Sequence, residues 1–319
     1  MAIMVGAYAA SPAHTQWNPT LEQEYLEALS ALRSVRGLEL PWIDGIHPHD
    51  SDWLLAHWPE SMDVMLTDIG GTVTRLSRDA RFGLASTGED GRLEAVAQAR
   101  RVRDDVSRLN DHTGRGAVIA IELHSAPLAS AGSSDALARS LEEISTWDWG
   151  GGALLIEHCD ALVDGQQPEK GYLSLDHEVA AIEKSGTDVG LSLNWGRSAI
   201  ELRSAARVLD HITRARESGR LRSVVFSGAA ATAGAFGNPW VDAHLPLAAS
   251  PDFPAGDPHS LLTLGEVRAT LAMAGPLDLV GIKFGWKKAG APVADRVAMI
   301  ESGAELVMDA LSSHRLAGR

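Results

Sequence analysis

The sequence alternates short apolar runs with longer amphipathic stretches, and this alternation limits the available folds more than any other feature. Eight runs have the composition of strands that are buried on both faces: 3–9, 37–42, 63–69, 117–124, 153–158, 189–195, 222–228 and 279–286. The clearest helical periodicity lies between or after them, at 21–35, 91–111, 134–145, 198–218 and 293–314. Doubly buried strands that alternate with helices are typical of a parallel sheet covered by helices.

Eight such units in a chain of 319 residues predict an α/β fold of the closed (β/α)₈ type, a TIM barrel with a parallel eight-stranded sheet. We expect a single domain over residues 1–319, because no linker or internal repeat separates the units. No GxGxxG motif follows the first run, which argues against a dinucleotide-binding fold. Residues 232–260 form a long Pro/Gly-rich loop. A loop of that length in a compact domain is usually a lid or a binding loop, so we expect it over the C-terminal mouth of the barrel.

The charge balance and the single cysteine narrow the class of protein. Forty-two acidic residues against 28 basic ones give a formal net charge of −14. Phosphate backbones and anionic lipids repel such a chain, so we expect neither nucleic acid nor a membrane as a partner. No apolar run reaches the roughly 18 residues that a transmembrane helix needs, and the N-terminal segment lacks a basic n-region. Cys159 is the only cysteine, which excludes an internal disulfide. We expect a soluble, cytoplasmic protein; a homo-oligomer is compatible with the sequence, which does not fix the oligomeric state.

Reactive side chains gather where the apolar runs end, and in a (β/α)₈ barrel the chemistry sits at that end of the strands. The fifth run closes with Glu157 and His158, followed by Cys159 and Asp160. Successive side chains on a strand point to opposite faces, so an inward Glu157 sends His158 towards the helices. The same count predicts a ring of inward groups at the mouth: Tyr8, Glu39, Glu122, His124, Glu157, Asn194, Ser227 and Lys283. Several buried charges must be paired, bind a cation or face a wet cleft, so the ring predicts a functional site.

We assign two groups of roles at this mouth. Catalytic roles are expected for Glu157, Lys283, Glu122 and His124. Substrate binding is expected for Tyr8, Glu39, Trp42, His158, Asp160, Asn194, Trp195, Arg197 and Trp286. For His158 and Asp160 the alternative is that they only fix neighbouring groups or a loop. Cys159 is interpreted as a packed thiol, because its acidic neighbours raise its pKa. His47, His49 and Asp50 have metal-like spacing but are interpreted as a turn.

The tryptophans and one arginine indicate the kind of ligand. Trp42, Trp195 and Trp286 all fall at strand ends, where indoles suit stacking on a sugar, although core packing is the alternative for each. Arg197 precedes Ser198, and Glu201 stands three residues further on, a capping-box spacing that predicts a helix start at Ser198. An arginine beside a helix N-terminus suits a carboxylate, phosphate or sulfonate. We expect a small carbohydrate, or an anionic derivative of one, as the ligand.

Several segments together resemble one protein family: VGAYAASP, GLELPW, ELHSAP, IEHCDA, EKGYL, LNWGRSAIE and FSG. It is a domain-of-unknown-function family within the xylose isomerase-like superfamily of sugar (phosphate) isomerases and epimerases. The resemblance covers nearly the whole chain and implies the barrel fold. It also implies a divalent metal, which superfamily members bind through a glutamate on strand five, an aspartate and a histidine on strand six, a histidine on strand seven and a glutamate on strand eight.

The chain departs from that ligand pattern. Glu157 matches the first ligand, but Asn194 and Arg197, Ser227 and Lys283 stand at the places of the others. Amide and hydroxyl oxygens are poor ligands for transition metals, and an ammonium has no lone pair to give. We therefore expect no cofactor, with Lys283 in the place of the metal. A metal held by Glu39, Glu122, His124 and Glu157 is the alternative.

The leading functional prediction is an isomerase or epimerase that moves a proton through an enediolate. Glu157 takes the proton, Glu122 or His124 returns it, and Lys283 stabilises the enediolate oxygen. Nearby tryptophans are expected to raise the pKa of Glu157 by desolvation. Two alternatives stay open. One is a lyase or glycosidase-type enzyme that uses Glu122 and Glu157 as acid and base, or Lys283 as a Schiff base. The other is a non-catalytic sugar-binding barrel.

Overall fold

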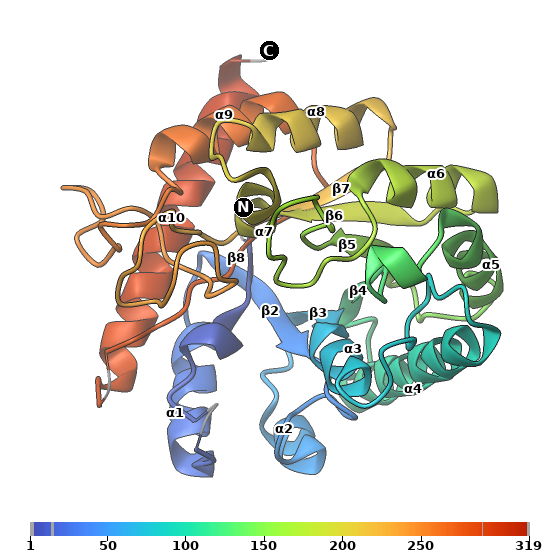
Figure 1. Cartoon of the computed structure of the whole chain (residues 1–319). Helices are drawn as coiled ribbons and strands as arrows, with labels where there is room; N and C mark the ends of the chain where they lie inside the picture. Colours follow the sequence, from blue (N-terminus) through green and yellow to red (C-terminus); the bar gives the residue numbers. More distant parts are fainter. Residues whose placement is uncertain (1–2, 14–15, 289, 318–319) are drawn as a thin grey trace.

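Eight parallel strands close into a barrel in chain order, which confirms the predicted α/β fold (Figure 1). The structure, a computed structural model, describes residues 3–13, 16–288 and 290–317. β1 pairs with β8 to complete the ring. The strands are β1 (Ile3–Val5), β2 (Val35–Pro41), β3 (Asp63–Thr67), β4 (Val118–Leu123), β5 (Ala153–His158), β6 (Gly190–Asn194), β7 (Leu221–Phe226) and β8 (Leu279–Ile282).

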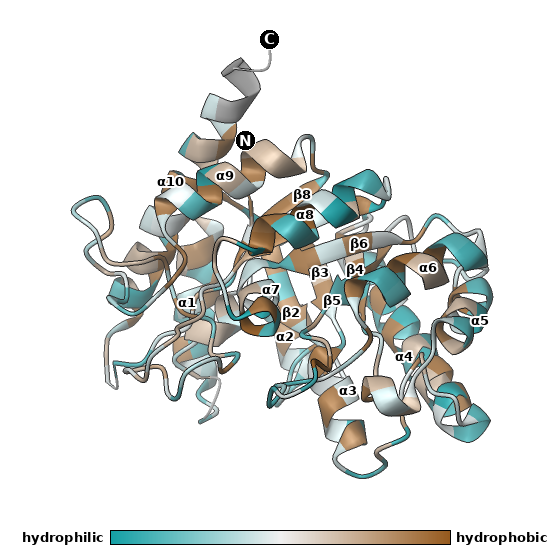
Figure 2. Ribbon diagram, turned by 45° about the horizontal axis from the view of Figure 1, so that its top comes forward, coloured by the Kyte–Doolittle hydropathy of each residue, from teal (hydrophilic) through white to brown (hydrophobic). Residues whose placement is uncertain are grey.

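Helices surround the strands, and hydrophilic residues gather on outer helices such as α5, α6 and α8 (Figure 2). The α-helices are α1 (Pro19–Ser30), α2 (Ser51–His57), α3 (Ile69–Leu76), α4 (Glu89–Thr113), α5 (Ser134–Ile144), α6 (Leu175–Ser185), α7 (Trp195–Leu202), α8 (Val208–Glu217), α9 (Leu264–Ala274) and α10 (Val293–Ala317). Short 3₁₀ helices lie at η1 (Ala7–Ala10) and η2 (Ala129–Ala131). In the part of the chain that the structure describes, none of these helices combines the length and the apolar character needed to cross a bilayer.

The interior of the barrel has an apolar lower layer and a polar upper layer. The lower layer is a separate hydrophobic cluster of inward side chains: Met4, Met65, Ala120, Leu155, Val225 and Leu279. Two residues further along a strand, the side chain returns to the same face. Glu122 therefore stands above Ala120, and Glu157 stands above Leu155. The upper polar layer lies at the C-terminal ends of the strands, where the sequence predicts it.

The segment between β6 and β7 contains two helices where the sequence predicts one helix over 198–218. The Asn194 side chain accepts hydrogen bonds from the backbone N–H groups of Gly196 (3.1 Å) and Arg197 (3.3 Å), so α7 begins at Trp195. The predicted helix start at Ser198 is wrong because this cap lies four residues earlier. Arg203 adopts a left-handed conformation with φ 49° and ends α7. The early start places Arg197 in the first turn of α7, at the mouth.

The loop between β2 and α2 contains the HPHD segment, residues 47–50. In the HPHD segment, the Asp50 carboxylate caps α2 by accepting from the Trp53 backbone N–H at 2.9 Å, and His47 Nδ1 accepts from the Asp50 N–H at 2.9 Å. This confirms the interpretation as a turn.

Between β7 and α9, residues 227–263 form the long loop. Its His244 carbonyl accepts a hydrogen bond from the Gly285 N–H just after β8.

Candidate active site

A buried ion pair joins β8 to β2 across β1. Lys283 follows β8, and its Nζ lies 2.5 Å from Oε1 of Glu39, with both side chains at most 1% exposed. The Tyr8 hydroxyl donates to the same oxygen at 3.4 Å, and the Lys283 ammonium lies 5.0 Å from the centre of the Tyr8 ring. Burial by itself lowers the pKa of Lys283, but Glu39, Tyr8 and Glu157 raise it well above its usual value. The ammonium is therefore charged and held in one place.

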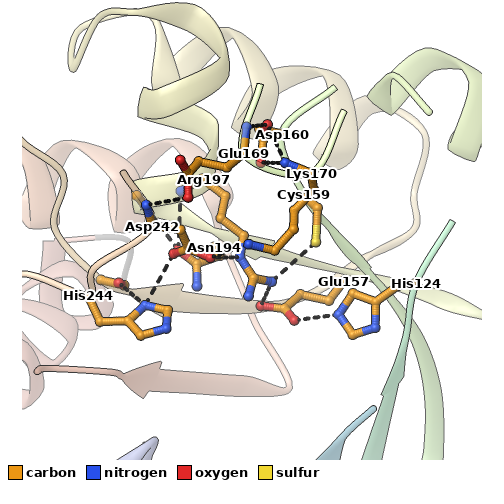
Figure 3. A network of polar contacts seen from close by, with 12 residues as sticks. His124, Glu157, Cys159, Asp160, Glu169, Lys170, Asn194, Arg197, Asp242 and His244 are labelled. Atoms are coloured by element: carbon orange, nitrogen blue, oxygen red, sulfur yellow. Dashed lines mark hydrogen bonds and ion pairs between the residues drawn. The ribbon is translucent and has the colours of Figure 1, made fainter. Parts of the chain in front are cut away.

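A second buried cation, Arg197, pairs with Glu157 near the end of β5. Nη1 of Arg197 lies 2.7 Å from Oε1 of Glu157, and Nε2 of His124 lies 2.8 Å from Oε2 (Figure 3). Burial raises the pKa of Glu157, but Arg197 and Lys283 outweigh it and hold the pKa well below its usual range. The predicted raised pKa for Glu157 is therefore wrong, because the charges of Arg197 and Lys283 outweigh its desolvation.

Glu122 has the opposite electrostatic character in the same layer. Its side chain is fully buried and forms no salt bridge among the described residues, and the Ser192 hydroxyl is the one hydrogen-bonding group that lowers its pKa. Burial, followed by the charges of Glu157 and Glu39, raises its pKa well above the usual value. An unpaired carboxyl group in such a place is stable as the neutral acid. The layer therefore combines a protonated Glu122 with an ionised Glu157.

His124 extends the polar layer outwards to Asp68. Its Nδ1 lies 2.7 Å from Oδ1 of Asp68, so the ring bridges the carboxylates of Asp68 and Glu157. Burial lowers the pKa of His124, but these two carboxylates raise it above its usual value. Asp68 follows β3 directly and was not among the predicted site residues. Its position at the end of the third apolar run was the signal that could have identified it.

The long loop brings Asp242 and His244 to the mouth, and neither residue was predicted there. Oδ2 of Asp242 lies 3.1 Å from Nε of Arg197 and 3.3 Å from Nζ of Lys170 (Figure 3). Burial raises the pKa of Asp242, but Arg197 and its other basic neighbours hold it well below its usual value. His244 stays neutral, because burial and the cations around it outweigh the Asp242 carboxylate and lower its pKa to about 3. No strand-end pattern marks a residue in the middle of a long loop.

Ser227, His244 and Asp242 lie together but do not have the geometry of a hydrolytic triad. Ser227 Oγ lies 3.0 Å from Nδ1 of His244, and Oδ1 of Asp242 lies 3.3 Å from the same nitrogen. In a Ser-His-Asp triad the serine and the aspartate contact different ring nitrogens. Ser227 does lie at the mouth, as the alternation along β7 predicts, but its contacts are those of a group that positions His244.

Two of the three tryptophans expected to stack on a sugar point away from the mouth. Trp42 is 1% exposed, and its Nε1 donates to Asp105 of α4 at 2.7 Å. Trp195 is fully buried in the main hydrophobic core. Trp42 lies three residues after the inward Glu39, and Trp195 lies one residue after the inward Asn194. Because side chains alternate between the two faces, both tryptophans face the helices. Trp286 is half-buried and donates its N–H to the Lys288 carbonyl at 2.8 Å. The stacking prediction is wrong for Trp42 and Trp195.

His158 and Asp160 also lie outside the mouth, so the prediction that they bind substrate is wrong. Nδ1 of His158 lies 2.7 Å from Glu178 of α6, and Nε2 lies 3.0 Å from Glu201 of α7. Burial lowers the pKa of His158, but these carboxylates raise it to about 10. Asp160 accepts hydrogen bonds from backbone N–H groups of the loop before α6, at 2.7 Å and 3.0 Å, and so fixes that loop. These are the loop-fixing alternatives considered above.

Cys159 lies on the inward face of the same segment. Nη1 of Arg197 donates to its Sγ at 3.4 Å. Burial raises the pKa of the Cys159 thiol well above its usual value, and Arg197 lowers it less than burial raises it. The thiol is therefore neutral and serves as a packing and hydrogen-bonding group, as predicted from the sequence.

A pocket opens beside the buried layer, between β2, η1 and the turn before α2. Its empty volume is about 500 Å³, and Tyr8 and Glu39 lie in its wall together with Glu22 and the residues of 46–49. Gly6 keeps the inner end of this region open for Lys283. A Cβ atom at Gly6 would lie 2.7 Å from Cγ of Lys283 and 3.0 Å from Oε2 of Glu39.

Two carboxylates at the mouth that could bind a divalent metal are instead paired with basic side chains. Glu157 is paired with Arg197 and His124, and Glu39 is paired with Lys283. An ammonium and a guanidinium have only hydrogen-bond donors and cannot act as ligands. Within the described ranges, the one set of three histidine, cysteine or acidic side chains that converges closely enough for a metal is His158, Glu201 and His211, outside the barrel.

Sequence comparison connects the chain to proteins without an assigned reaction. A family model described as "Domain of unknown function (DUF4862)" matches residues 4–299. The chain is 36% identical over 313 residues to the "Uncharacterized protein STM3670" of Salmonella typhimurium, with 96% of this chain and 97% of that protein covered.

Structural comparison shows the fold. The "IOLI protein with a binding zinc atom" matches with a TM-score of 0.60 at 12% identity, covering 98% of this chain and 99% of the other. A xylose isomerase domain containing protein from Salmonella typhimurium matches with a TM-score of 0.56 at 10% identity over 96% of both chains. A sugar phosphate isomerase/epimerase from Parabacteroides distasonis matches with a TM-score of 0.54 at 9% identity, over 96% of this chain and 95% of the other. These neighbours share the (β/α)₈ barrel fold with this chain.

Proposed function

The chain belongs to the DUF4862 family, and from the chemistry of its barrel mouth we propose that it is an isomerase or epimerase of a sugar or an anionic sugar derivative. One observation carries the proposal. A carboxyl group with a raised pKa, Glu122, and one with a lowered pKa, Glu157, share a buried layer with two fixed cations. Environments that push two carboxyl pKa values apart define an acid and a base.

The proposed reaction moves a proton between carbon atoms next to a carbonyl group. Glu157, which is ionised, takes the proton from carbon, and Glu122, which is protonated, returns one. The negative charge that develops on the carbonyl oxygen is stabilised by the ammonium of Lys283. A positioned base contributes roughly 10²–10⁴-fold, and a fixed charge aimed at the oxygen about 10²–10³-fold.

Arg197 connects the base to an anionic substrate. In the structure, Arg197 holds Oε1 of Glu157 and lowers its pKa, which makes Glu157 a weak base. A carboxylate or phosphate group of a substrate that pairs with Arg197 would release this oxygen. The pKa of Glu157 would then rise towards the range that a general base needs. Binding of the correct anion and activation of the base are thus one event.

The chain from Glu157 through His124 to Asp68 gives the proton a place to go. His124 contacts both carboxylates through its two ring nitrogens. A ring that is hydrogen-bonded on both sides can release a proton at one nitrogen as it accepts a proton at the other. This arrangement carries the proton away from Glu157 after each turnover, and Glu122 takes one proton back from solvent before the next.

We propose that no divalent metal is needed at the mouth, because Lys283 and Arg197 supply the positive charge. Lys283 also does not act as a Schiff-base nucleophile, since its pKa is raised and the nitrogen carries no free electron pair.

Glu39, Glu122, Glu157, Arg197 and Lys283 are at most 1% exposed. Substrate therefore enters when the loop that carries Asp242 opens, or through the pocket beside Tyr8 and Glu39.

The test is proton exchange at carbon. The protein is incubated in D₂O with a panel of aldoses, ketoses, sugar acids and their phosphates, and deuterium next to the carbonyl is measured by NMR. We expect uptake with at least one member, and loss of more than about 100-fold in Glu157→Gln and Lys283→Met. Glu217→Gln and Lys184→Met, on exposed helix surfaces, are matched controls.

Other outcomes would identify other functions. Hydrolysis of a glycoside without exchange would show a glycosidase-type enzyme that uses the same two carboxyl groups. A substrate adduct trapped by borohydride would show Schiff-base chemistry. Tight binding of a panel sugar without exchange or hydrolysis would show a non-catalytic sugar-binding barrel.

A further inference from the structure

We propose that His158, Glu201 and His211 form a binding site for one Zn²⁺ ion on the outside of the barrel. This zinc site joins the end of β5 to α7 and α8. One ligand atom from each of the three side chains lies within 4.8 Å of the other two. His158 and Glu157 point to opposite faces of β5, so the zinc site lies outside the mouth and its existence does not rest on the proposed function.

Both histidines are held in the orientation that a metal requires. Nδ1 of His158 lies 2.7 Å from the Glu178 carboxylate, which only accepts hydrogen bonds, so this nitrogen carries the hydrogen. Nδ1 of His211 lies 3.2 Å from Oγ of Ser198. The Nε2 atoms of both rings are thereby directed at Glu201. Metal-binding histidines almost always use their second nitrogen in this way, with a carboxylate or another polar group as the partner.

The two distances between the histidine nitrogens and the Glu201 oxygens are close to those in a tetrahedral zinc shell. Zinc bonds of about 2.0–2.2 Å place neighbouring ligand atoms roughly 3.3 Å apart. Nε2 of His158 lies 3.0 Å from Oε2 of Glu201, and Nε2 of His211 lies 3.4 Å from Oε1 of the same carboxylate. Glu201 and His211 are each 9% exposed. A water molecule from this opening would complete the fourth position.

The charges of the cluster also favour a divalent cation. Glu178 and Glu201 bring two negative charges, and in the part of the chain that the structure describes their only ion pairs are with histidines. Glu178 also accepts a hydrogen bond from the Ser125 hydroxyl, and Glu201 accepts one from the Ala161 N–H at 2.8 Å, but neither donor carries a charge. Zn²⁺ with two neutral histidines brings the sum to zero. Because unpaired buried charge is costly, the ion would stabilise the fold.

The position of the zinc site gives it a consequence for the mouth. Its ligands lie on both sides of Arg203, where the left-handed turn separates α7 from α8. An ion bound to Glu201 and His211 would fix this break, and with it the first turn of α7. That turn carries Arg197, the partner of Glu157. Zn²⁺ bound at this site would therefore fix the position of the helix turn that carries Arg197.

The test is metal binding by the full chain, with Zn²⁺ and Co²⁺ as the probes. After chelator treatment and reloading, we expect one equivalent of Zn²⁺ by elemental analysis and the visible absorption of four-coordinate Co²⁺. His211→Gln and Glu201→Gln should lose the ion. Ser198→Ala, which keeps all three ligands, should weaken binding about 10–100-fold. His177→Gln removes an exposed histidine from α6 and is the matched control.

Three results would overturn the proposal. The first is a folded wild-type chain that binds neither ion. The second is binding that Ser198→Ala and His211→Gln leave unchanged. The third is an ion that Glu122→Gln releases and His211→Gln retains, because that ion would lie inside the barrel.

Discussion

Lys283 Nζ lies 2.5 Å from Oε1 of Glu39, so the last strand of the barrel presents a fixed ammonium to the second strand inside a fully buried layer. In superfamily barrels the resemblance places a glutamate ligand on the eighth strand. Here the same strand supplies the cation itself. Lys283 thus places a fixed positive charge at the mouth, and this relationship leads to several expected results.

The first prediction concerns the stability of that pair. Lys283→Met leaves Glu39 buried without its partner and should lower the free energy of unfolding by about 3–5 kcal/mol. The double variant Glu39→Gln/Lys283→Met should recover most of this loss, because neither charge remains. Urea denaturation of both variants measures the difference. If the single variant loses less than about 1 kcal/mol, the pair is not buried as described.

The second prediction concerns the pH dependence set by Glu122. Its pKa is higher in the folded chain than the ordinary value of 4.5, so the folded state binds more protons above that pH. Its contribution to stability is present below about pH 4.5 and is lost as the pH rises through the folded pKa. Glu122→Gln removes this loss. The variant should therefore gain stability relative to wild type between pH 4 and pH 8.

Denaturant titrations at a series of pH values would measure this gain, with the exposed Glu217→Gln as the control. A stability difference between Glu122→Gln and wild type that stays constant over the pH range would show that Glu122 ionises normally.

The third prediction uses the space that Gly6 leaves. Gly6→Ala places a Cβ atom 2.7 Å from Cγ of Lys283, on the buried stem of the side chain. The ammonium must shift, and a misplacement of about 1 Å costs up to 10²-fold in rate. Deuterium exchange measures the loss. Gly265→Ala, whose Cβ would meet its nearest atom at 3.4 Å, should leave the rate unchanged. If Gly6→Ala exchanges deuterium as fast as Gly265→Ala, the position of Lys283 does not matter for the reaction.

The fourth prediction compares two helix caps. Asn194→Ala removes the cap of α7 and should cost about 0.5–2 kcal/mol. It should also weaken binding of an anionic substrate, because the first turn of α7 carries Arg197. Asn18→Ala removes the equivalent cap of α1, where Asn18 accepts from the Leu21 N–H at 3.2 Å. We expect a comparable loss of stability there with no change in KM. A KM change in both variants would argue against the positioning role of Asn194.

The strands and the polar layer were predictable because both depend on local periodicity. Alternation along a buried strand orders side chains by parity, which placed Glu122, Glu157 and Lys283 correctly on the inward face. The same parity excludes Trp42 and Trp195 from the mouth. Their prediction failed because proximity to a strand end was given more importance than the direction of the side chain.

The partners of these residues were not predictable in the same way. Arg197 pairs with Glu157 and Asp242, contacts that join positions 40 and 45 residues apart in the chain. The lowered pKa of Glu157 follows from those pairings. The break between α7 and α8 depends on a single left-handed residue, Arg203, in a sequence with continuous helical periodicity. The partners of Arg197 depend on long-range contacts, and the break between α7 and α8 depends on one backbone conformation. Local sequence patterns predict neither.

The most direct measurement of the central claim is the rate of deuterium incorporation by Lys283→Met, in the presence and absence of added Mn²⁺, on the panel sugar that wild type exchanges. The account predicts a loss of more than about 100-fold that Mn²⁺ does not restore, while wild type exchanges at the same rate with or without the ion. Wild-type exchange that requires Mn²⁺, or exchange by Lys283→Met at the wild-type rate, would contradict it.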